Sequence, residues 1–225
     1  MFTLPGDTRL ARGMKATILA ATLSLAAASA AQPASAASPA AARAFTIEQV
    51  LSAPFPTSLT AAGQGGRVAW VYNKGGSRNG WVAEPGADGS YAARTISAYA
   101  GDDGYDLGEL NWAPDGRQVV YSRGGSLEGG GPVNVLSRPS GAVGQEIWVA
   151  SVDGTAPRRL GSGHAPSVSP RGDAVAYILE GQVWTSPLAG GGEPAQLLHD
   201  RGQTEALAWS PDGARIAFVS ARGDH

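Results

Sequence analysis

The sequence predicts an all-β fold: a β-propeller of four-stranded antiparallel blades, incomplete at about three and a half blades, with a short N-terminal helix. A turn motif, W-x-P-D-G, stands at residues 112–116 and again at residues 209–213. Each copy is followed by a strand in which apolar residues alternate with period two. The 225 residues include 32 Gly and 15 Pro but only 16% charged residues, a composition typical of short strands joined by tight turns.

The motif belongs to a longer repeat. Degenerate copies stand at residues 168–172 and 61–65, so the interval is roughly 40 to 55 residues, the length of a propeller blade. A Trp marks the third strand of each complete unit, at Trp81, Trp148 and Trp184. We expect these side chains to pack between adjacent blades. The predicted blades are residues 57–99, 108–161, 165–200 and 205–225, the last with two strands. A β-sandwich with chance motif matches does not account for the shared order of strands and turns.

The motif also has a physical role. Pro114 fixes φ at the first corner, Asp115 caps its own turn and Gly116 supplies a positive φ. The same three residue types recur at 211–213. We therefore expect each motif to join two antiparallel strands as a hairpin.

Residues 1–36 have the layout of a signal peptide. A basic start with Arg9, Arg12 and Lys15 precedes an uncharged, Ala-rich run at 16–31 and a small-residue cleavage site at 34–36. A membrane anchor is the alternative, but the run is short and only weakly hydrophobic. We therefore expect an exported protein, periplasmic or extracellular, with no membrane span after cleavage. Residues 37–44 read as a flexible spacer and residues 45–225 as the partial propeller.

A short helix is expected at residues 46–51, before the blades. Thr46 stands at the N-cap and Gln49 three residues later, which is a capping-box arrangement. We expect this helix to lie against the rim of the propeller.

Several classes of function are disfavoured. The net charge of −2 gives no reason to expect a nucleic-acid partner, and the absence of cysteine excludes thiol chemistry. The sequence contains no G-x-S-x-G, no P-loop and no H-E-x-x-H, and its three histidines are isolated. We expect no catalytic residues, metal or cofactor in this chain, and no hydrolysis by the chain alone.

Two segments are candidate sites. Asp102, Asp103 and Asp106, with Glu109 beyond them, form an acidic cluster that could hold Ca²⁺ or a substrate amine. A solvated loop between blades is the alternative. Residues 124–144 form an insertion of about twenty residues. It is a candidate site because long loops on a rigid scaffold are often functional. Its Glu128, Asn134 and Arg138 could contact a ligand or a partner domain, or the insertion could be a Gly-rich excursion without a role.

The order of an export signal, a helix at 45–51 and W-x-P-D-G blades resembles the N-terminal propeller of the prolyl oligopeptidase family of serine peptidases. That family includes the dipeptidyl peptidases and acylaminoacyl peptidases. The stretches 110–116 and 207–213 also resemble TolB-type envelope propellers. The resemblance spans residues 45–225, and its motif is specific for the fold rather than for a function.

The peptidase resemblance implies a gating propeller followed by an α/β-hydrolase domain that carries the Ser-Asp-His triad. None of the triad maps onto residues 1–225, so the chain is expected to be truncated before its catalytic domain, with a peptide substrate and that domain as partners. The TolB resemblance implies instead a non-catalytic protein that binds envelope proteins. A third hypothesis, a propeller enzyme with a metal in its central channel, needs inward-facing His or carboxylate ligands, of which the strands supply few.

Overall fold

A computed structural model describes residues 45–125 and 144–223. The chain divides into two units, residues 1–44 and residues 45–225, and the description below concerns the second. The expected signal peptide and spacer lie outside the described residues, as do Glu128, Asn134 and Arg138. The described part is almost entirely β structure, with one short helix, α1 (Ile47–Leu51).

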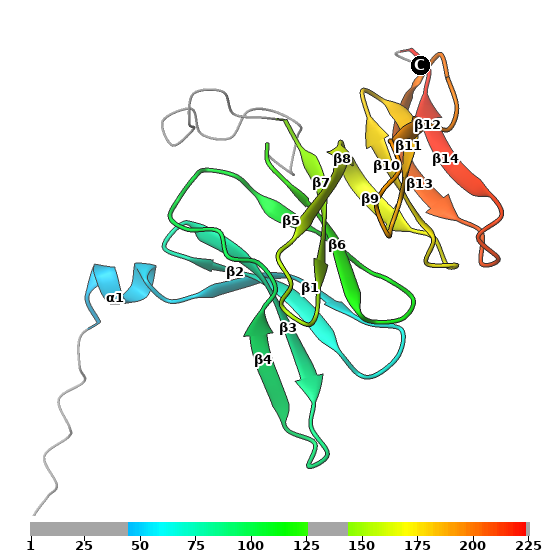
Figure 1. Cartoon of the computed structure of the whole chain (residues 1–225). Helices are drawn as coiled ribbons and strands as arrows, with labels where there is room; N and C mark the ends of the chain where they lie inside the picture. Colours follow the sequence, from blue (N-terminus) through cyan, green and yellow to red (C-terminus); the bar gives the residue numbers. More distant parts are fainter. Residues whose placement is uncertain (1–44, 126–143, 224–225) are drawn as a thin grey trace, which may run out of the picture. The chain divides into compact units, whose positions relative to one another are not determined.

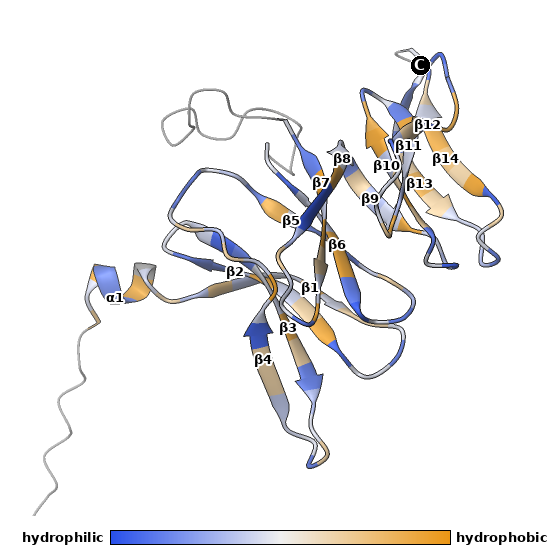
Figure 2. Ribbon diagram, viewed as in Figure 1, coloured by the Kyte–Doolittle hydropathy of each residue, from blue (hydrophilic) through white to orange (hydrophobic). Residues whose placement is uncertain are grey.

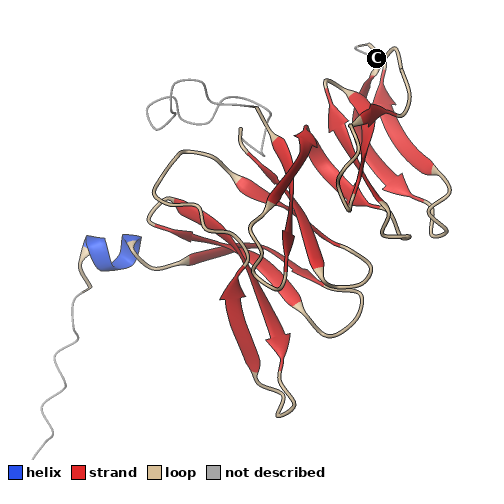
Figure 3. Ribbon diagram, in the orientation of Figure 1, coloured by secondary structure: helices blue, strands red, loops and turns tan. Residues whose placement is uncertain are grey.

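The strands form consecutive antiparallel sheets, drawn in Figures 1 and 3. Blade 1 contains β1 (Phe55–Ala61), β2 (Val68–Lys74), β3 (Ser77–Pro85) and β4 (Tyr91–Thr95). Blade 2 contains β5 (Leu107–Trp112), β6 (Gln118–Arg123), β7 (Glu146–Ser151) and β8 (Arg158–Ser162). Blade 3 contains β9 (His164–Val168), β10 (Ala174–Leu179), β11 (Gln182–Pro187) and β12 (Ala195–Gln196). Blade 4 contains two strands, β13 (Gln203–Trp209) and β14 (Ile216–Ala221).

The first strand of each blade is the inner strand. β1 contacts β5, β5 contacts β9 and β9 contacts β13, so these four strands run side by side through the middle of the blade series. Each of them breaks register once with the second strand of its blade. In three of them a non-glycine residue takes a positive φ at the break, namely Ser58, Glu109 and Ala165. Such bulges bend a strand and raise its twist.

The core lies between successive blades. One hydrophobic cluster joins Ala69 and Val71 of blade 1 to Val119 and Tyr121 of blade 2. Because side chains alternate along a strand, the opposite side of blade 2 is free to meet blade 3. Val120 there shares a second cluster with residues of blade 3 such as Val175 and Tyr177. We call the side of a blade that meets the next blade its forward face, and the other side its backward face. Figure 2 shows apolar residues along these strands.

The W-x-P-D-G turns have the expected geometry. Gly116 has a φ of 64°, and its N–H donates to the Ala113 carbonyl across 2.9 Å. Asp115 Oδ1 accepts the Arg117 N–H at 2.9 Å, so the carboxylate caps its own turn. The motif Trp has a second role that the turn chemistry does not predict. The indole N–H of Trp209 donates to the Ser167 carbonyl of blade 3 at 3.0 Å, which ties two inner strands together.

An arginine on the fourth strand makes a repeated bond between blades. The Arg94 Nε atom of blade 1 donates to the Val152 carbonyl of blade 2 at 2.7 Å. The Arg158 Nη2 atom of blade 2 donates to the Leu188 carbonyl of blade 3 at 2.6 Å. Arg94 and Arg158 each pair with the residue that follows the Trp of the third strand in their own blade. The two acceptor carbonyls also share one position, four residues after the third-strand Trp of the next blade. The blade series is therefore held by polar contacts at its outer strands as well as by its apolar clusters.

The helix and the tryptophans partly match expectation. The capping box is confirmed: Thr46 Oγ1 accepts the Gln49 N–H and Gln49 Oε1 accepts the Thr46 N–H, both at 3.1 Å. The expected packing of the helix on the rim is wrong, because Phe45, Ile47 and Val50 are all exposed. Trp148 and Trp184 do pack against the two inter-blade clusters. No helix in the described residues is long and apolar enough to span a membrane.

Candidate functional site

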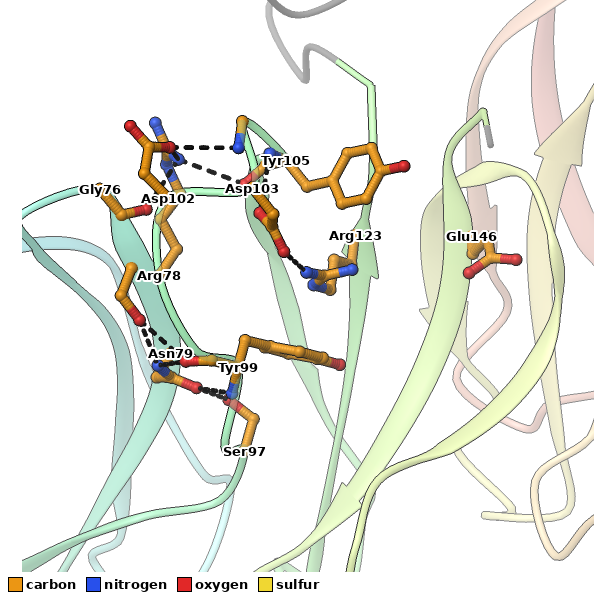
Figure 4. A network of polar contacts seen from close by, with 12 residues as sticks. Gly76, Arg78, Asn79, Ser97, Tyr99, Asp102, Asp103, Tyr105, Arg123 and Glu146 are labelled. Carbon is orange, nitrogen blue, oxygen red and sulfur yellow. Dashed lines mark hydrogen bonds and ion pairs between the residues drawn. The ribbon is translucent and has the colours of Figure 1, made fainter. Parts of the chain in front are cut away.

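The acidic cluster lies in the loop of residues 96–106, which connects β4 of blade 1 to β5 of blade 2. Asp102 Oδ1 accepts the Gly104 N–H at 3.1 Å, and Asp103 Oδ1 accepts the Tyr105 N–H at 3.0 Å. Each carboxylate therefore caps a tight turn of the loop itself. This loop, the start of β3 and the end of β6 meet at one end of the blades (Figure 4). The insertion 124–144 begins at the same place, directly after Arg123.

Two arginines neutralise most of the carboxylate charge. Arg78 Nη1 lies 3.7 Å from Asp102 Oδ1, and Arg78 Nε lies 3.5 Å from Asp106 Oδ1. Arg123 Nη2 forms an ion pair and hydrogen bond with Asp103 Oδ2. The structure thus brings Asp102, Asp103 and Asp106 together around guanidinium groups of this chain. The described residues contain no group of three or more His, Cys, Asp or Glu side chains placed to hold a metal ion.

Arg123 is the most enclosed of these charges. Its side chain is 14% exposed, and its guanidinium carbon lies 3.8 Å from the centroid of the Tyr99 ring and 4.9 Å from that of Tyr105. A guanidinium over an aromatic face gains electrostatic attraction that grows as water is removed. Arg123 therefore joins a carboxylate, two aromatic rings and the beginning of the insertion.

Tyr99 is itself held on three sides. Asn79 Oδ1 accepts the Tyr99 N–H at 2.7 Å, and Asn79 Nδ2 donates to the Tyr99 carbonyl at 2.9 Å. The Tyr99 hydroxyl lies 2.8 Å from that of Tyr121. Burial raises the pKa of Tyr99 and raises the pKa of Tyr121 further, so both phenols keep their protons at physiological pH. These contacts give Arg123 a fixed platform.

Glu109 does not belong to this group. Its carboxylate accepts hydrogen bonds from the Ser122 hydroxyl and, at 2.8 Å, from the Ala165 N–H. Ala165 lies on β9, so Glu109 links the inner strands of blades 2 and 3. Its φ of 52° places it at the bulge of β5. Asp102, Asp103 and Asp106 therefore pair with arginines, whereas Glu109 connects two inner strands.

We call the end of blades 1 and 2 that carries Arg78, Asp102, Asp103, Asp106 and Arg123 the rim. A polar cleft lies beside the rim, between blades 2 and 3. It has a volume of about 410 Å³, and its lining includes Glu146, His164 and Glu180. Glu146 Oε1 accepts from Arg159 Nε at 2.6 Å, and Glu146 Oε2 accepts from the Trp148 indole at 3.2 Å. His164 begins the inner strand β9 and lines this cleft. The cleft is lined by residues of different blades that are far apart along the chain. Such contacts between blades give no signal in the sequence.

Charged, aromatic and polar groups lie close together in this part of the molecule. The rim presents three carboxylates against two guanidiniums, a fixed aromatic platform and an adjacent polar cleft. Such groups can orient a polar ligand or the surface of another domain.

Comparison with known proteins identifies the fold. No protein-family model matches the chain, and no curated protein matches it. Among solved structures, a prolyl endopeptidase from a study of inter-domain dynamics superposes with a TM-score of 0.53 at 14% identity, over 77% of this chain and 27% of that one. An oligogalacturonate lyase in complex with manganese gives a TM-score of 0.51 at 14% identity, over 74% of this chain and 45% of that one.

The chain is a β-propeller. The expected likeness to prolyl oligopeptidase propellers is confirmed at the level of the fold, together with the four-stranded antiparallel blades. A putative TolB from Agrobacterium tumefaciens is also similar, with a TM-score of 0.44 at 17% identity, over 74% of this chain and 54% of that one. The chain thus spans between about a quarter and about half of the length of these three structures.

Proposed function

We propose that residues 45–225 are the gating and substrate-selecting propeller of an exported serine peptidase of the prolyl oligopeptidase family. The observation that carries the proposal is the match to a prolyl endopeptidase over 77% of this chain but only 27% of that enzyme. A match of this kind is expected if the chain corresponds to one domain of a larger enzyme. The α/β-hydrolase domain with its Ser-Asp-His triad would then be encoded after His225.

The rim would act as the selecting surface in this proposal. Its fixed charges, Asp102, Asp103 and Asp106 with Arg78 and Arg123, lie where the insertion 124–144 begins. Glu128, Asn134 and Arg138 of that insertion would contact the peptide or the hydrolase domain. The charged side chains of the rim are already paired with one another, so each contact with a polar peptide replaces an existing contact. The rim can therefore orient the peptide without binding it tightly.

The coding sequence after His225 gives the first test. We expect a G-x-S-x-G motif within a few hundred codons, in the strand–turn–helix context of a hydrolase nucleophile. A few further W-x-P-D-G units followed by a stop codon would contradict the peptidase proposal. That result would support the alternative, a TolB-like protein that binds envelope proteins, which a pull-down from envelope extract would then test.

The chain alone gives a second test. We expect purified residues 1–225 to hydrolyse neither peptide nor ester substrates above the rate of a buffer control. Turnover that persists through repurification, and that falls when a residue of the described rim or cleft is substituted, would show a catalytic site within this chain.

A further inference from the structure

The outer edge of blade 1 is an unprotected strand edge. β4 is the last strand of its sheet, so one side of its backbone pairs with β3 and the other side meets no strand of the described residues (Figure 1). Blades pack on one another through their faces, as blades 1 and 2 do, and this leaves an outer edge open. The exposure of β4 therefore does not depend on how many blades the propeller contains. An exposed edge is a template for pairing with another chain.

The hydrogen bonds at the two ends of β4 show which of its backbone groups are free. The Ile96 N–H donates to the Gly80 carbonyl at 2.8 Å, and the Gly86 N–H donates to the Ser90 carbonyl at 2.7 Å. Hydrogen-bonded and non-hydrogen-bonded positions alternate along an antiparallel pair, so the even-numbered residues of β4 bond to β3. The N–H and C=O groups of the odd-numbered residues point away from β3, and these residues are Tyr91, Ala93 and Thr95.

The outer strands of blades 2 and 3 are protected in ways that β4 is not. β8 contains an extra residue, Leu160, between its pairs with Ile147 and Trp148, and a bulge of this kind interrupts pairing at an edge. β8 also carries Arg159, whose side chain is 46% exposed. β12 consists of two residues. β4 pairs regularly over all five of its residues and contains neither Pro nor Lys.

The single charge of β4 is already paired. Arg94 Nη1 lies 2.7 Å from Glu84 Oε2, and Arg94 Nε donates to the Val152 carbonyl of blade 2. These contacts hold the guanidinium on the forward face of blade 1. The side chains of β4 on the backward face are uncharged and exposed. The edge therefore carries no unpaired charge that would repel a second strand.

β4 is complementary to itself in one antiparallel register. A two-fold axis through Ala93 places Ala93 opposite its copy, Tyr91 opposite Thr95, and Ala92 opposite Arg94. The three free positions then become the hydrogen-bonded pairs of the new ladder, so each outward N–H and C=O finds a partner. Tyr91 and Thr95 form an aromatic–β-branched pair, and the two copies of Arg94 do not stand opposite one another. An axis through Ala92 or Arg94 would instead present groups that β3 already uses.

We propose that β4 of one copy of this protein pairs with β4 of a second copy, antiparallel and centred on Ala93. The two four-stranded sheets of blade 1 become one continuous sheet, by the same strand addition that many domains use to bind extended peptides. The contact is isologous, as in most two-fold symmetric dimers. Because each copy contributes one short strand, we expect weak, concentration-dependent association. This inference goes beyond the proposed function and needs neither peptide nor hydrolase.

Cysteine cross-linking of the whole gene product tests the register. Residues 1–225 contain no cysteine, and Ala92 and Ala93 are adjacent, exposed alanines of one strand. In the proposed register the two copies of residue 93 have Cα atoms about 5.5 Å apart, within reach of a disulfide. The two copies of residue 92 lie diagonally, about 7–8 Å apart. After mild oxidation, we expect Ala93→Cys to give a two-copy band on non-reducing electrophoresis and Ala92→Cys to resemble the parent protein.

Sedimentation velocity over a dilution series tests the hydrogen bonds. Ala93→Pro removes an N–H that points away from β3, so it blocks the new ladder and leaves the bonds between β3 and β4 in place. Ala93→Ser is the matched control, because it changes the same side chain and keeps the N–H. We expect the parent protein and Ala93→Ser to form two-copy particles that separate on dilution. The dissociation constant of Ala93→Pro should be at least about tenfold higher.

Three results would overturn the proposal. They are a parent protein that stays single at every concentration, an Ala93→Pro variant that pairs as tightly as Ala93→Ser, and an Ala93→Cys variant that cross-links no more than Ala92→Cys. Far-ultraviolet circular dichroism checks the fold of each variant, and the two cysteine variants decide the matter if Ala93→Pro does not fold. Because no peptide is present, none of these outcomes decides the proposed peptidase function.

Discussion

At the scale of single residues, charge pairing decides how the acidic loop is used. The sequence predicted that Asp102, Asp103 and Asp106 gather in one loop, and they do. It did not predict that Arg78 and Arg123 lie among them, since these arginines are separated from the loop by a whole strand or more. A run of carboxylates is visible in a sequence, whereas its counter-ions depend on which strands become neighbours.

Substitution of Arg123 tests the rim directly. Arg123→Ala leaves Asp103 without its partner and removes the cation from the Tyr99 ring. We expect the free energy of unfolding to fall by about 2 kcal/mol, between the values typical of exposed and buried ion pairs. Arg123→Lys should lose about half as much, because it keeps the charge but not the planar group. Urea denaturation followed by tryptophan fluorescence measures the change.

A double-mutant cycle provides the control for Arg123. Adding Asp103→Asn to Arg123→Ala should cost less than the two single losses together, since the pair is removed as a unit. Strictly additive losses, or an Arg123→Ala variant as stable as the parent chain, would show that the ion pair contributes nothing to the fold.

Asp200 gives the chain a stability that depends on acid pH. A hydrogen bond from Ser220, together with one from Arg222, lowers the pKa of Asp200 from 3.8 to about 2. A carboxyl whose pKa is lower in the folded state stabilises the fold fully above its unfolded pKa. That contribution is lost as the pH falls from 3.8 towards 2. Asp200→Asn should therefore flatten the dependence of the urea midpoint on pH in this window.

The parent chain serves as its own reference in that titration. For midpoints measured in steps from about pH 5 to about pH 2, the difference between the parent and Asp200→Asn should shrink towards the acid end, since Asp200 is losing its charge there. A constant difference between the two across the whole window would mean that the charge of Asp200 has no part in stability.

At the scale of elements, the repeat was predictable because its turns need particular residues. Pro, Asp and Gly at fixed positions specify the turn, and period-two alternation specifies the strands that flank it. The capping box specified α1 in the same local way. The packing of α1 was not predictable, because capping fixes where a helix begins but not which surface it meets. The bulges of the inner strands also left no mark in the sequence, since Ser58, Glu109 and Ala165 share no residue type.

Glycine substitution tests the turn mechanism. Gly116 has a φ of 64°, and a Cβ there would lie 3.3 Å from the Gln64 carbonyl oxygen. We expect Gly116→Ala to lower the free energy of unfolding by about 1–2 kcal/mol, the cost of a left-handed conformation for a residue with a Cβ. Gly63→Ala is the matched control, because Gly63 does not have a positive φ and nothing lies within 4 Å of its added carbon.

Denaturation midpoints of the two glycine variants should therefore separate. Gly63→Ala should stay within about 0.5 kcal/mol of the parent chain, as exposed substitutions usually do. Equal losses in both variants would show that the turn tolerates a side chain, and that the Gly of the W-x-P-D-G motif has another purpose.

At the scale of the whole molecule, the fold is that of a β-propeller. The fold class could be predicted because every blade repeats the same local pattern. The function could not be read in the same way, since a propeller serves many activities and its turn motif is common to them. The charged rim of blades 1 and 2, the adjacent cleft and the insertion at 124–144 are the features that distinguish this chain from a plain repeat.

We propose that residues 45–225 select short peptides for a hydrolase encoded after them. The most direct measurement is the hydrolysis rate of the whole gene product on fluorogenic peptides of increasing length and on an unfolded protein with the same cleavage sequence. We expect kcat/KM to fall steeply with peptide length and the unfolded protein to resist cleavage. A gene product that cleaves long and short substrates equally well, or that cleaves neither, would contradict it.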